Sequence, residues 1–379
     1  MNIEVDNYAH YKELEISGRY ITNESIANLN FKYNAKVCGY SVNNLPINSF
    51  NIGSGPIKIL IWSQMHGNES TSTKALFDSI SFFHIHEPEM LKKLTLLVIP
   101  ILNPDGALLY TRENANNIDL NRDAQNLTQP ESKLLRSTFE SFKPDYCYNL
   151  HDQRTIYGIE SDAIRPATVS FLAPAYNENR EVNEVRAKAI KVIIAMNKIL
   201  QEFIPNQVGR FDDSFNINCV GDTFQFLNVP TILIEAGHFP GDYERELTRK
   251  YVFISLVEGL LKINENDIVI NKIEDYMNIP HNKICFYDFI YKNIKINYDN
   301  NKIITNFALQ FKEEIIGNQL VYNAYTAAIG DLEGFSGHFE LDVEEALYED
   351  LELNIPKIDQ KAEFSLGKSI KFVNGLMKN

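Results

Sequence analysis

The sequence has little of what marks secreted, membrane or disulfide-rich proteins. Its four cysteines, Cys38, Cys147, Cys219 and Cys285, are far apart and form no CxxC pair, so a disulfide framework or a thiolate zinc site is not expected. No run of about 18 uncharged apolar residues occurs, and the first residues show no basic segment followed by an apolar one. We therefore expect a cytoplasmic protein with free thiols and no membrane partner.

Positive charge is also scarce. Lys and Arg number 36 against 50 Asp and Glu, which gives a formal net charge of −14. No cluster of basic residues alternates with aromatic ones, so nucleic acid is not an expected partner. With 379 residues, the chain exceeds what one hydrophobic core commonly supports, which predicts one large and one smaller domain.

What is present, from about residue 57 to 263, is an alternation of short apolar runs and helical patterns. It predicts an α/β fold with a mostly parallel mixed sheet and helices on both faces. Strands are predicted over Ile57 to Trp62, Leu94 to Pro100, Asp145 to Leu150, Thr168 to Ala173 and Thr231 to Glu235. Helices are predicted over Ser70 to Phe83, Glu131 to Phe142, Asn177 to Phe203 and Tyr243 to Ile263.

Beyond residue 264 the segments become shorter and more strand-like. Ile294 to Tyr298 and Ile303 to Phe311, joined by Asp299 to Asn301, predict a β-hairpin. We predict a catalytic domain over residues 1–264, with an N-terminal extension of about 50 residues, and a small β-rich domain over residues 265–379.

A pattern of metal ligands lies at the predicted strand ends. His66 and Glu69 stand three residues apart just after the first strand, and His151 follows the strand that ends at Leu150. Open α/β sheets bind ligands beyond the carboxyl ends of their strands. Two imidazoles and one carboxylate with a position left for water are a common catalytic zinc site. The HxxE spacing alone is weak, because it also occurs by chance on helix surfaces.

Further polar motifs follow. Asn103 to Gly106, with the sequence NPDG, is expected to form a sharp turn after the second strand. Arg112 comes next, and then the run Asp119 to Arg122, with the sequence DLNR. Adjacent Asn121 and Arg122 offer planar donors suited to a carboxylate, although an arginine in a loop is more often a solvated surface charge.

The order HGNE, NPDG, DLNR, a single His after a strand and a Glu at a strand end resembles the zinc carboxypeptidases of the carboxypeptidase A type. The resemblance covers about residues 50 to 260. Zinc deacylases of the succinylglutamate desuccinylase and aspartoacylase type are close relatives that share the HxxE, the DLNR and the later His and Glu.

The resemblance implies roles for seven residues. It makes His66, Glu69 and His151 the ligands of a Zn²⁺ ion and Glu235 the general acid/base. Arg112 matches the arginine that stabilises the oxyanion, although Glu113 beside it suits a surface ion pair equally well. Asn121 and Arg122 match the pair that binds the terminal carboxylate of the substrate. Asp152 suits either a contact behind the metal ligands or a position facing solvent.

One departure keeps alternatives open. Zinc carboxypeptidases carry a tyrosine some twenty residues before the catalytic Glu, and here residues 211–216 read FDDSFN. The first expectation is a metallocarboxypeptidase that cleaves an amide bond next to a free carboxylate in small peptides. The deacylases lack this tyrosine too, so an N-acyl amino acid deacylase is the alternative. A catalytically inactive, metal-dependent binding protein ranks below both.

Overall fold

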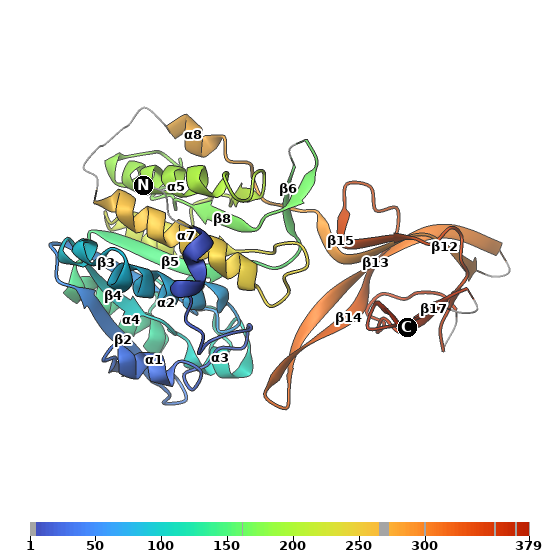
Figure 1. Ribbon diagram of the computed structural model, residues 1–379, viewed down its shortest axis with the longest axis horizontal. Coiled ribbons are helices and arrows are strands. Elements are labelled where there is room, and N and C mark those ends of the chain that lie inside the picture. Colours follow the sequence, from blue (N-terminus) through green and yellow to red (C-terminus); the bar gives the residue numbers. More distant parts are fainter. Residues whose placement is uncertain are drawn as a thin grey trace. The chain divides into compact units, whose positions relative to one another are not determined.

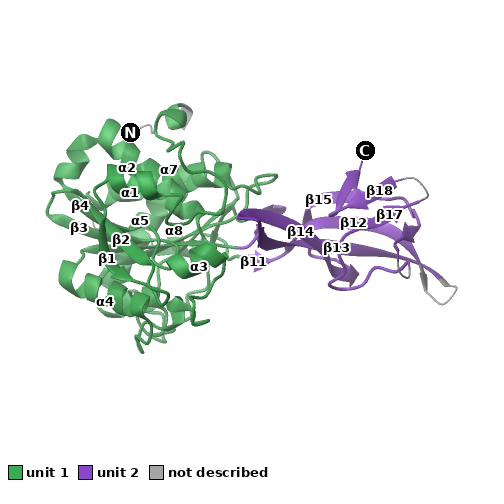
Figure 2. Ribbon diagram, turned by 90° about the horizontal axis from the view of Figure 1, so that it is seen from below, with its two compact units in different colours: residues 1–153, 167–282 green, residues 154–166, 283–379 purple. Residues whose placement is uncertain are grey.

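The protein divides into two compact units. The computed structural model describes residues 5–160, 162–264, 273–298, 301–351, 354–367 and 370–378. Unit 1 comprises residues 1–153 and 167–282, and unit 2 comprises residues 154–166 and 283–379 (Figure 2). The predicted boundary at 264/265 adjoins residues 265–272, which lie outside the described residues. Unit 1 continues to residue 282, and unit 2 includes a segment that begins three residues after His151.

Unit 1 is built on one mixed sheet (Figure 1). Its strands are β1 (Lys36–Tyr40), β2 (Pro46–Gly53), β3 (Ile57–Trp62), β4 (Leu94–Ile99), β5 (Tyr146–Asp152), β8 (Val169–Leu172), β9 (Val208–Arg210) and β10 (Thr231–Ala236). They lie in the order β1-β2-β4-β3-β5-β10-β8-β9. The four central strands β4, β3, β5 and β10 are parallel to one another. Their carboxyl ends therefore meet at one edge of the sheet.

Helices surround this sheet. They are α1 (Ala27–Lys32), α2 (Thr71–Ile85), α3 (Pro104–Leu109), α4 (Pro130–Phe142), α5 (Glu184–Leu200), α6 (Val220–Phe226), α7 (Glu246–Ile263) and α8 (Ile273–Met277). Short 3₁₀ helices in the described part of the chain are η1 (Val5–His10), η2 (Pro88–Lys92) and η3 (Leu120–Arg122).

The two faces of the sheet carry separate hydrophobic clusters. Side chains alternate along a strand, so Ile59 and Ile61 of β3 pack in a cluster with α2, α5 and α7. Leu60 and Trp62 point the other way and pack in a cluster with α4 and α6. Both faces of the central strands are thus buried, which explains their nearly continuous apolar sequences. The predicted α/β fold with helices on both faces is confirmed.

Most predicted elements of unit 1 agree with the structure to within about two residues, with exceptions at α5, at α7 and at the NPDG motif. The strand Ile57 to Trp62 is reproduced as β3, whereas α5 begins only at Glu184 instead of Asn177. The NPDG motif does not form the expected sharp turn but begins helix α3. The side chain of Asn103 accepts a hydrogen bond from the backbone N of Gly106 at 2.9 Å, and proline is well suited to a first helical turn.

The predicted N-terminal extension contributes to the sheet. β2 pairs antiparallel with β4, and β1 pairs antiparallel with β2. Residues 36–53 therefore form one edge of the unit 1 sheet.

Unit 2 is rich in strands, as predicted. Its strands are β6 (Tyr157–Glu160), β7 (Ile164–Pro166), β11 (Lys283–Ile284), β12 (Phe286–Tyr298), β13 (Asn301–Ile316), β14 (Gln319–Gly330), β15 (Ser336–Asp342), β16 (Tyr348–Glu349), β17 (Phe364–Leu366), β18 (Ile370–Val373) and β19 (Leu376–Lys378). They form three sheets, β11-β6-β7, β14-β13-β12-β15 and β16-β17-β18-β19. The predicted hairpin is confirmed by the antiparallel pairing of β12 with β13, and residues 299–300 of its turn lie outside the described residues.

The core of unit 2 is aromatic. Phe364 stacks on Phe372 with ring centroids 4.8 Å apart, and Tyr291 packs edge-on against both rings. Phe307 stacks on Tyr291 with centroids 5.0 Å apart. These rings join residues of the two larger sheets into one cluster.

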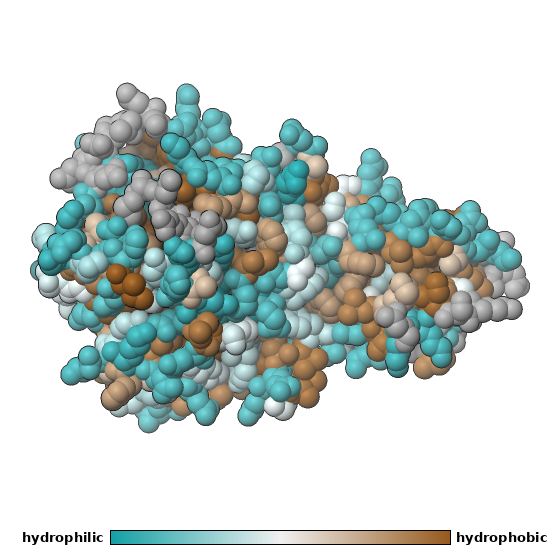
Figure 3. All heavy atoms as spheres, in the orientation of Figure 1, coloured by the Kyte–Doolittle hydropathy of each residue, from teal (hydrophilic) through white to brown (hydrophobic). Residues whose placement is uncertain are grey.

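The surface mixes polar and apolar side chains. On the face drawn in Figure 3, separate groups of apolar residues are interspersed with hydrophilic ones. Among the described residues, no helix has the length and apolar character needed to cross a membrane.

Candidate metal centre and active site

The first two candidate ligands lie in the loop between β3 and α2. The backbone N of Glu69 donates to the carbonyl of His66 at 3.1 Å, which closes a turn and brings both side chains to one side. Gly67 between them passes close to the start of α3, since a Cβ at this position would lie 1.9 Å from the carbonyl carbon of Gly106. The glycine of HGNE is therefore required by the close approach of two backbones.

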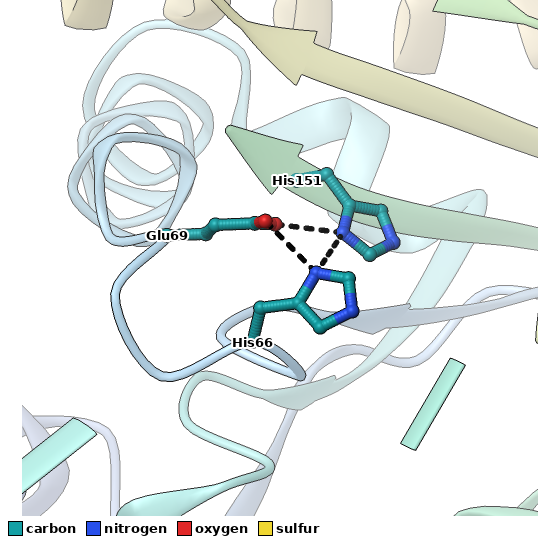
Figure 4. A group of neighbouring side chains, drawn as sticks. All are labelled: His66, Glu69 and His151. Carbon is teal, nitrogen blue, oxygen red and sulfur yellow. Dashed lines mark hydrogen bonds and ion pairs between the residues drawn. The ribbon is translucent and has the colours of Figure 1, made fainter. Parts of the chain in front are cut away.

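His151 completes the group from the next strand. It lies within β5, one residue before the end of the strand, and not after it as expected from the sequence. Its Nδ1 lies 2.8 Å from Oε2 of Glu69 and 3.1 Å from Nδ1 of His66, while Nδ1 of His66 lies 2.9 Å from Oε1 of Glu69. Figure 4 shows the carboxylate and both rings pointing toward one another.

These three side chains suit a zinc ion. Their ligand atoms lie within 4.8 Å of one another, and the set contains two imidazole nitrogens and one carboxylate. Burial alone would raise the pKa of Glu69, but His66 and His151 outweigh it and hold that pKa below its ordinary value. Glu69 is therefore ionised, as a metal ligand must be.

Asp119 and Arg112 support this group from the side of η3. Nε2 of His66 lies 3.0 Å from Oδ1 of Asp119, and Arg112 donates to Oδ2 of Asp119 from Nε at 3.1 Å and from Nη2 at 3.0 Å. Burial opposes ionisation of Asp119, but the bond from His66 and the charge of Arg112 prevail and lower its pKa. A carboxylate on the far nitrogen of a ligand imidazole fixes the orientation of the ring.

Arg112 also reaches one of the candidate metal ligands. Its Nη1 lies 3.4 Å from Oε1 of Glu69, and its side chain is 40% exposed. The ion pair with Glu113 that the sequence left open is not formed, and the guanidinium bonds to Asp119 and Glu69 in its place.

Glu235 lies beside His151 on the neighbouring strand. β10 runs parallel to β5 with Glu235 paired with His151, so the two side chains leave the same face of the sheet on strands about 4.8 Å apart. Burial raises the pKa of Glu235 well above its ordinary value, and the charges of Glu69 and Asp152 raise it further. A carboxyl group with a raised pKa beside a metal site is suited to general acid/base catalysis.

Asn121 and Arg122 both contact the segment that leads into α6. The side-chain oxygen of Asn121 accepts a hydrogen bond from the backbone N of Val220 at 2.9 Å. Nη1 of Arg122 donates to the carbonyl of Asn121 at 2.8 Å and to Sγ of Cys219 at 3.2 Å. Arg122 is exposed, so the guanidinium remains within reach of a dissolved anion.

Residues 211–216, where the family tyrosine is missing, form a loop between β9 and α6. Asp213 anchors it, because one of its oxygens lies 2.5 Å from Nη2 of the fully buried Arg186 in α5. A buried arginine–carboxylate bond is strong and directional. This loop is therefore fixed to the body of unit 1 at Asp213.

Comparison with known proteins agrees with this geometry. Residues 25–145 match a family model described as zinc carboxypeptidase. The resemblance to zinc carboxypeptidases is confirmed. The matched segment includes His66, Glu69, Arg112, Asn121 and Arg122, whereas His151 and Glu235 lie beyond it.

Individual proteins that resemble this zinc carboxypeptidase-like chain are named as carboxypeptidases too. A probable carboxypeptidase 2 from Trichophyton verrucosum is 32% identical over 161 residues, which is 40% of this chain and 28% of the relative. A probable carboxypeptidase 2 from Arthroderma benhamiae is 32% identical over 124 residues, which is 31% of this chain and 23% of the relative. The matches thus span less than a third of the length of these two relatives.

A solved structure supports the fold. Carboxypeptidase A from Helicoverpa armigera superposes with a TM-score of 0.51 at 14% sequence identity, over 66% of this chain and 75% of that one. At this identity the likeness concerns the arrangement of the sheet and helices.

The sequence analysis missed the role of Asp119 and left that of Asp152 open. Asp119 was seen only as part of DLNR, although an aspartate at the start of a short helix beside an arginine is a usable signal. Asp152 does not face solvent, because its carboxylate accepts hydrogen bonds from the backbone N of Thr71 at 2.9 Å and of Ser72 at 3.3 Å. It fixes the start of α2 against the strand that carries His151.

Proposed function

We propose that this protein is a zinc-dependent carboxypeptidase that hydrolyses the amide bond next to the free carboxylate of small peptides. The observation that carries the proposal is the convergence of His66, Glu69 and His151 beside Glu235 at one sheet edge. The match of residues 25–145 to zinc carboxypeptidases supports it.

The zinc ion would be held by His66, Glu69 and His151. When bound, zinc lowers the pKa of a coordinated water to about 7 and polarises a substrate carbonyl. Glu235 would take a proton from the attacking water and pass it to the leaving amine. Proton transfer by a positioned side chain contributes on the order of 10² to 10⁴ in rate.

The two arginines would take different parts. Arg112, held by Asp119 next to Glu69, would stabilise the negative charge that develops on the carbonyl oxygen. Arg122, held by the carbonyl of Asn121, would bind the terminal carboxylate of the substrate through its planar guanidinium. Amidated peptides should therefore be poor substrates.

A second candidate is an N-acyl amino acid deacylase. It is favoured by the loop at residues 211–216, which contains no tyrosine and is anchored by Asp213 instead. Both candidates use the same metal ligands and the same Glu235, so substrate preference separates them.

The test is mass spectrometry of products after the zinc-loaded protein meets short peptides and N-acyl amino acids in one pool. Loss of C-terminal residues supports the carboxypeptidase, whereas release of acyl groups alone supports the deacylase. Glu235→Gln should bind zinc as the parent does and lose on the order of 10² to 10⁴ in rate. Zinc binding with neither pool consumed would favour a binding protein instead.

The role of Arg122 is tested with matched free and amidated peptides. The parent should prefer the free peptide, and Arg122→Ala should lose this preference. Arg122→Lys keeps the charge without the planar fork and should retain part of it. An unchanged preference in Arg122→Ala would assign carboxylate binding to another residue.

A further inference from the structure

A buried arginine connects the two strands that carry His151 and Glu235. Arg245 precedes α7 and is 1% exposed. Its Nη1 donates to the carbonyl of Ala236 at 2.8 Å and its Nη2 to the carbonyl of Gln153 at 2.6 Å. Ala236 directly follows Glu235, and Gln153 stands two residues after His151. One rigid guanidinium therefore spans the carboxyl ends of both strands.

The same arginine reaches the third ligand through Asp152. Its Nη1 lies 3.6 Å from Oδ2 of Asp152. The backbone N of Asp152 donates to Oε2 of Glu69 at 3.1 Å. Arg245 thus lies beside Asp152, whose peptide N holds Glu69, and its positive charge offsets this buried carboxylate next to the site.

The backbone at Arg245 supports a specific role for its side chain. The residue has φ 56° and ψ 33°, which is the left-handed region, and its side chain makes no capping bond to α7. Glycine or asparagine adopts this conformation more easily than arginine does. Such a conformation persists where the surroundings fix it, and here the bonds to Gln153 and Ala236 do so.

The side chain of Gln153 extends the same connection. Its Nε2 donates to the carbonyl of Ala167 at 2.6 Å, and its Oε1 accepts from Nδ2 of Asn282 at 2.7 Å. The peptide N of Gln153 also donates to the carbonyl of Ala236 at 2.8 Å. The chain directly after β5 is therefore held at Gln153 by its peptide N, by its side chain and by the bond from Arg245 to its carbonyl.

We propose that Arg245 is a positioning residue that holds His151, Glu69 and Glu235 in the arrangement needed to bind zinc and to hydrolyse substrate. The part that concerns hydrolysis rests on the function proposed above. The part that concerns zinc affinity does not depend on which substrate is cleaved.

The test compares two buried arginines near the start of α7. Arg245→Lys keeps the charge but cannot span both carbonyls in the same way. Arg249→Lys is the matched control, because Arg249 is fully buried and bonds to Asp78 and to the carbonyls of Glu13 and Ile16. Zinc affinity is measured by competition with a chelator, kcat and KM with the substrate found above, and Tm by calorimetry.

We expect Arg245→Lys to lower zinc affinity and kcat by about 10- to 100-fold, as loss of contacts behind metal ligands does, with KM within about twofold. Arg249→Lys should lower Tm and leave zinc affinity and kcat as in the parent at temperatures where it is folded. Equal zinc affinity and kcat in the two variants would overturn the proposal.

Two further outcomes separate the role of Arg245 from the proposed function. If the parent binds zinc but consumes no substrate, the proposed function fails, and zinc affinity alone decides the role of Arg245. If Arg245→Lys does not fold, Arg245→Gln serves in its place, because a neutral amide can donate to one of the two carbonyls but cannot span both. Unchanged zinc affinity in Arg245→Gln would then overturn the proposal.

Discussion

Units 1 and 2 each contain an aspartate that accepts several hydrogen bonds, and the two aspartates have different partners. Asp119 of unit 1 binds the side chains of His66 and Arg112. Asp288 of unit 2 is fully buried, accepts from the backbone N of Phe311 at 2.7 Å and is bonded by the side chain of Gln310. The first carboxylate orients a ring of the candidate metal site, and the second fixes one strand against another.

The difference shows where chemistry can take place in this chain. At the carboxyl edge of the unit 1 sheet, side chains bond to side chains, and three of them form a possible metal site. In the part of unit 2 that the structure describes, no comparable group of three ligands occurs, and aromatic rings fill the core. The candidate metal site therefore belongs to unit 1.

The largest effect should follow removal of a ligand. Glu69→Gln replaces a carboxylate by a neutral amide, so zinc affinity should fall by more than the roughly 100-fold that loss of an outer contact produces. Competition with a chelator measures it. Unaltered zinc affinity would mean that Glu69 does not bind the metal. The two units would then no longer differ by the metal site that we assign to unit 1.

Asp119→Asn should have a smaller effect on the same property. It keeps the size of the side chain but weakens the bond to His66 and the ion pair with Arg112. We expect zinc affinity or kcat to fall by about 10- to 100-fold. An effect as small as that of a surface substitution would show that Asp119 does not orient the ligand ring.

Asp288→Asn tests the counterpart in unit 2. The amide cannot accept as well from both Phe311 and Gln310, so unit 2 should lose about 1–3 kcal/mol of stability. Hydrogen exchange of β12 and β13 measures the loss, and zinc affinity should be unchanged. Weakened zinc binding in this variant would contradict the division of roles between the two units.

One buried group in each unit should make stability depend on pH, and the two contributions have opposite signs. In unit 2, burial lowers the pKa of His338 from its ordinary value of 6.5 to about 4. The unfolded chain therefore binds the proton more readily, and stability falls as pH drops from about 6.5 to 4. His338→Gln should remove this dependence, worth about 1–3 kcal/mol. Exchange rates in unit 2 at several pH values provide the measurement.

In unit 1, burial raises the pKa of Asp222 from its ordinary value of 3.8 to about 7. Here the folded state holds the proton more tightly, so its contribution is full below about pH 3.8 and is lost as pH rises through 7. Asp222→Asn should be the more stable protein above pH 7 by on the order of 1 kcal/mol. Denaturant unfolding of the parent and variant at pH 5 and pH 8 compares them. A difference that does not change with pH would refute the shift.

The sequence predicted the central strands closely because both of their faces are buried. Apolar runs such as Ile57 to Trp62 have one structural solution in an α/β fold, and β3 begins and ends where the run does. The edge strands β1 and β2 were missed, since they are partly exposed and less apolar. The start of α3 was missed as well. Asn103, whose side chain caps this helix, belongs to a residue type that is equally typical of turns.

By itself, the sequence determined the order of the central strands and the main helices, the three metal-ligand candidates and the position of Glu235 at the end of its strand. Only the tertiary structure decided that His66 and His151, 85 positions apart, place their Nδ1 atoms 3.1 Å from each other. It also decided that Asp119 and Arg245 stand behind the ligands. The sequence shows which side chains can bind a metal, because that depends on the residue type alone. The residues that hold these side chains in place come from segments far apart in the sequence, and only the folded chain brings them together.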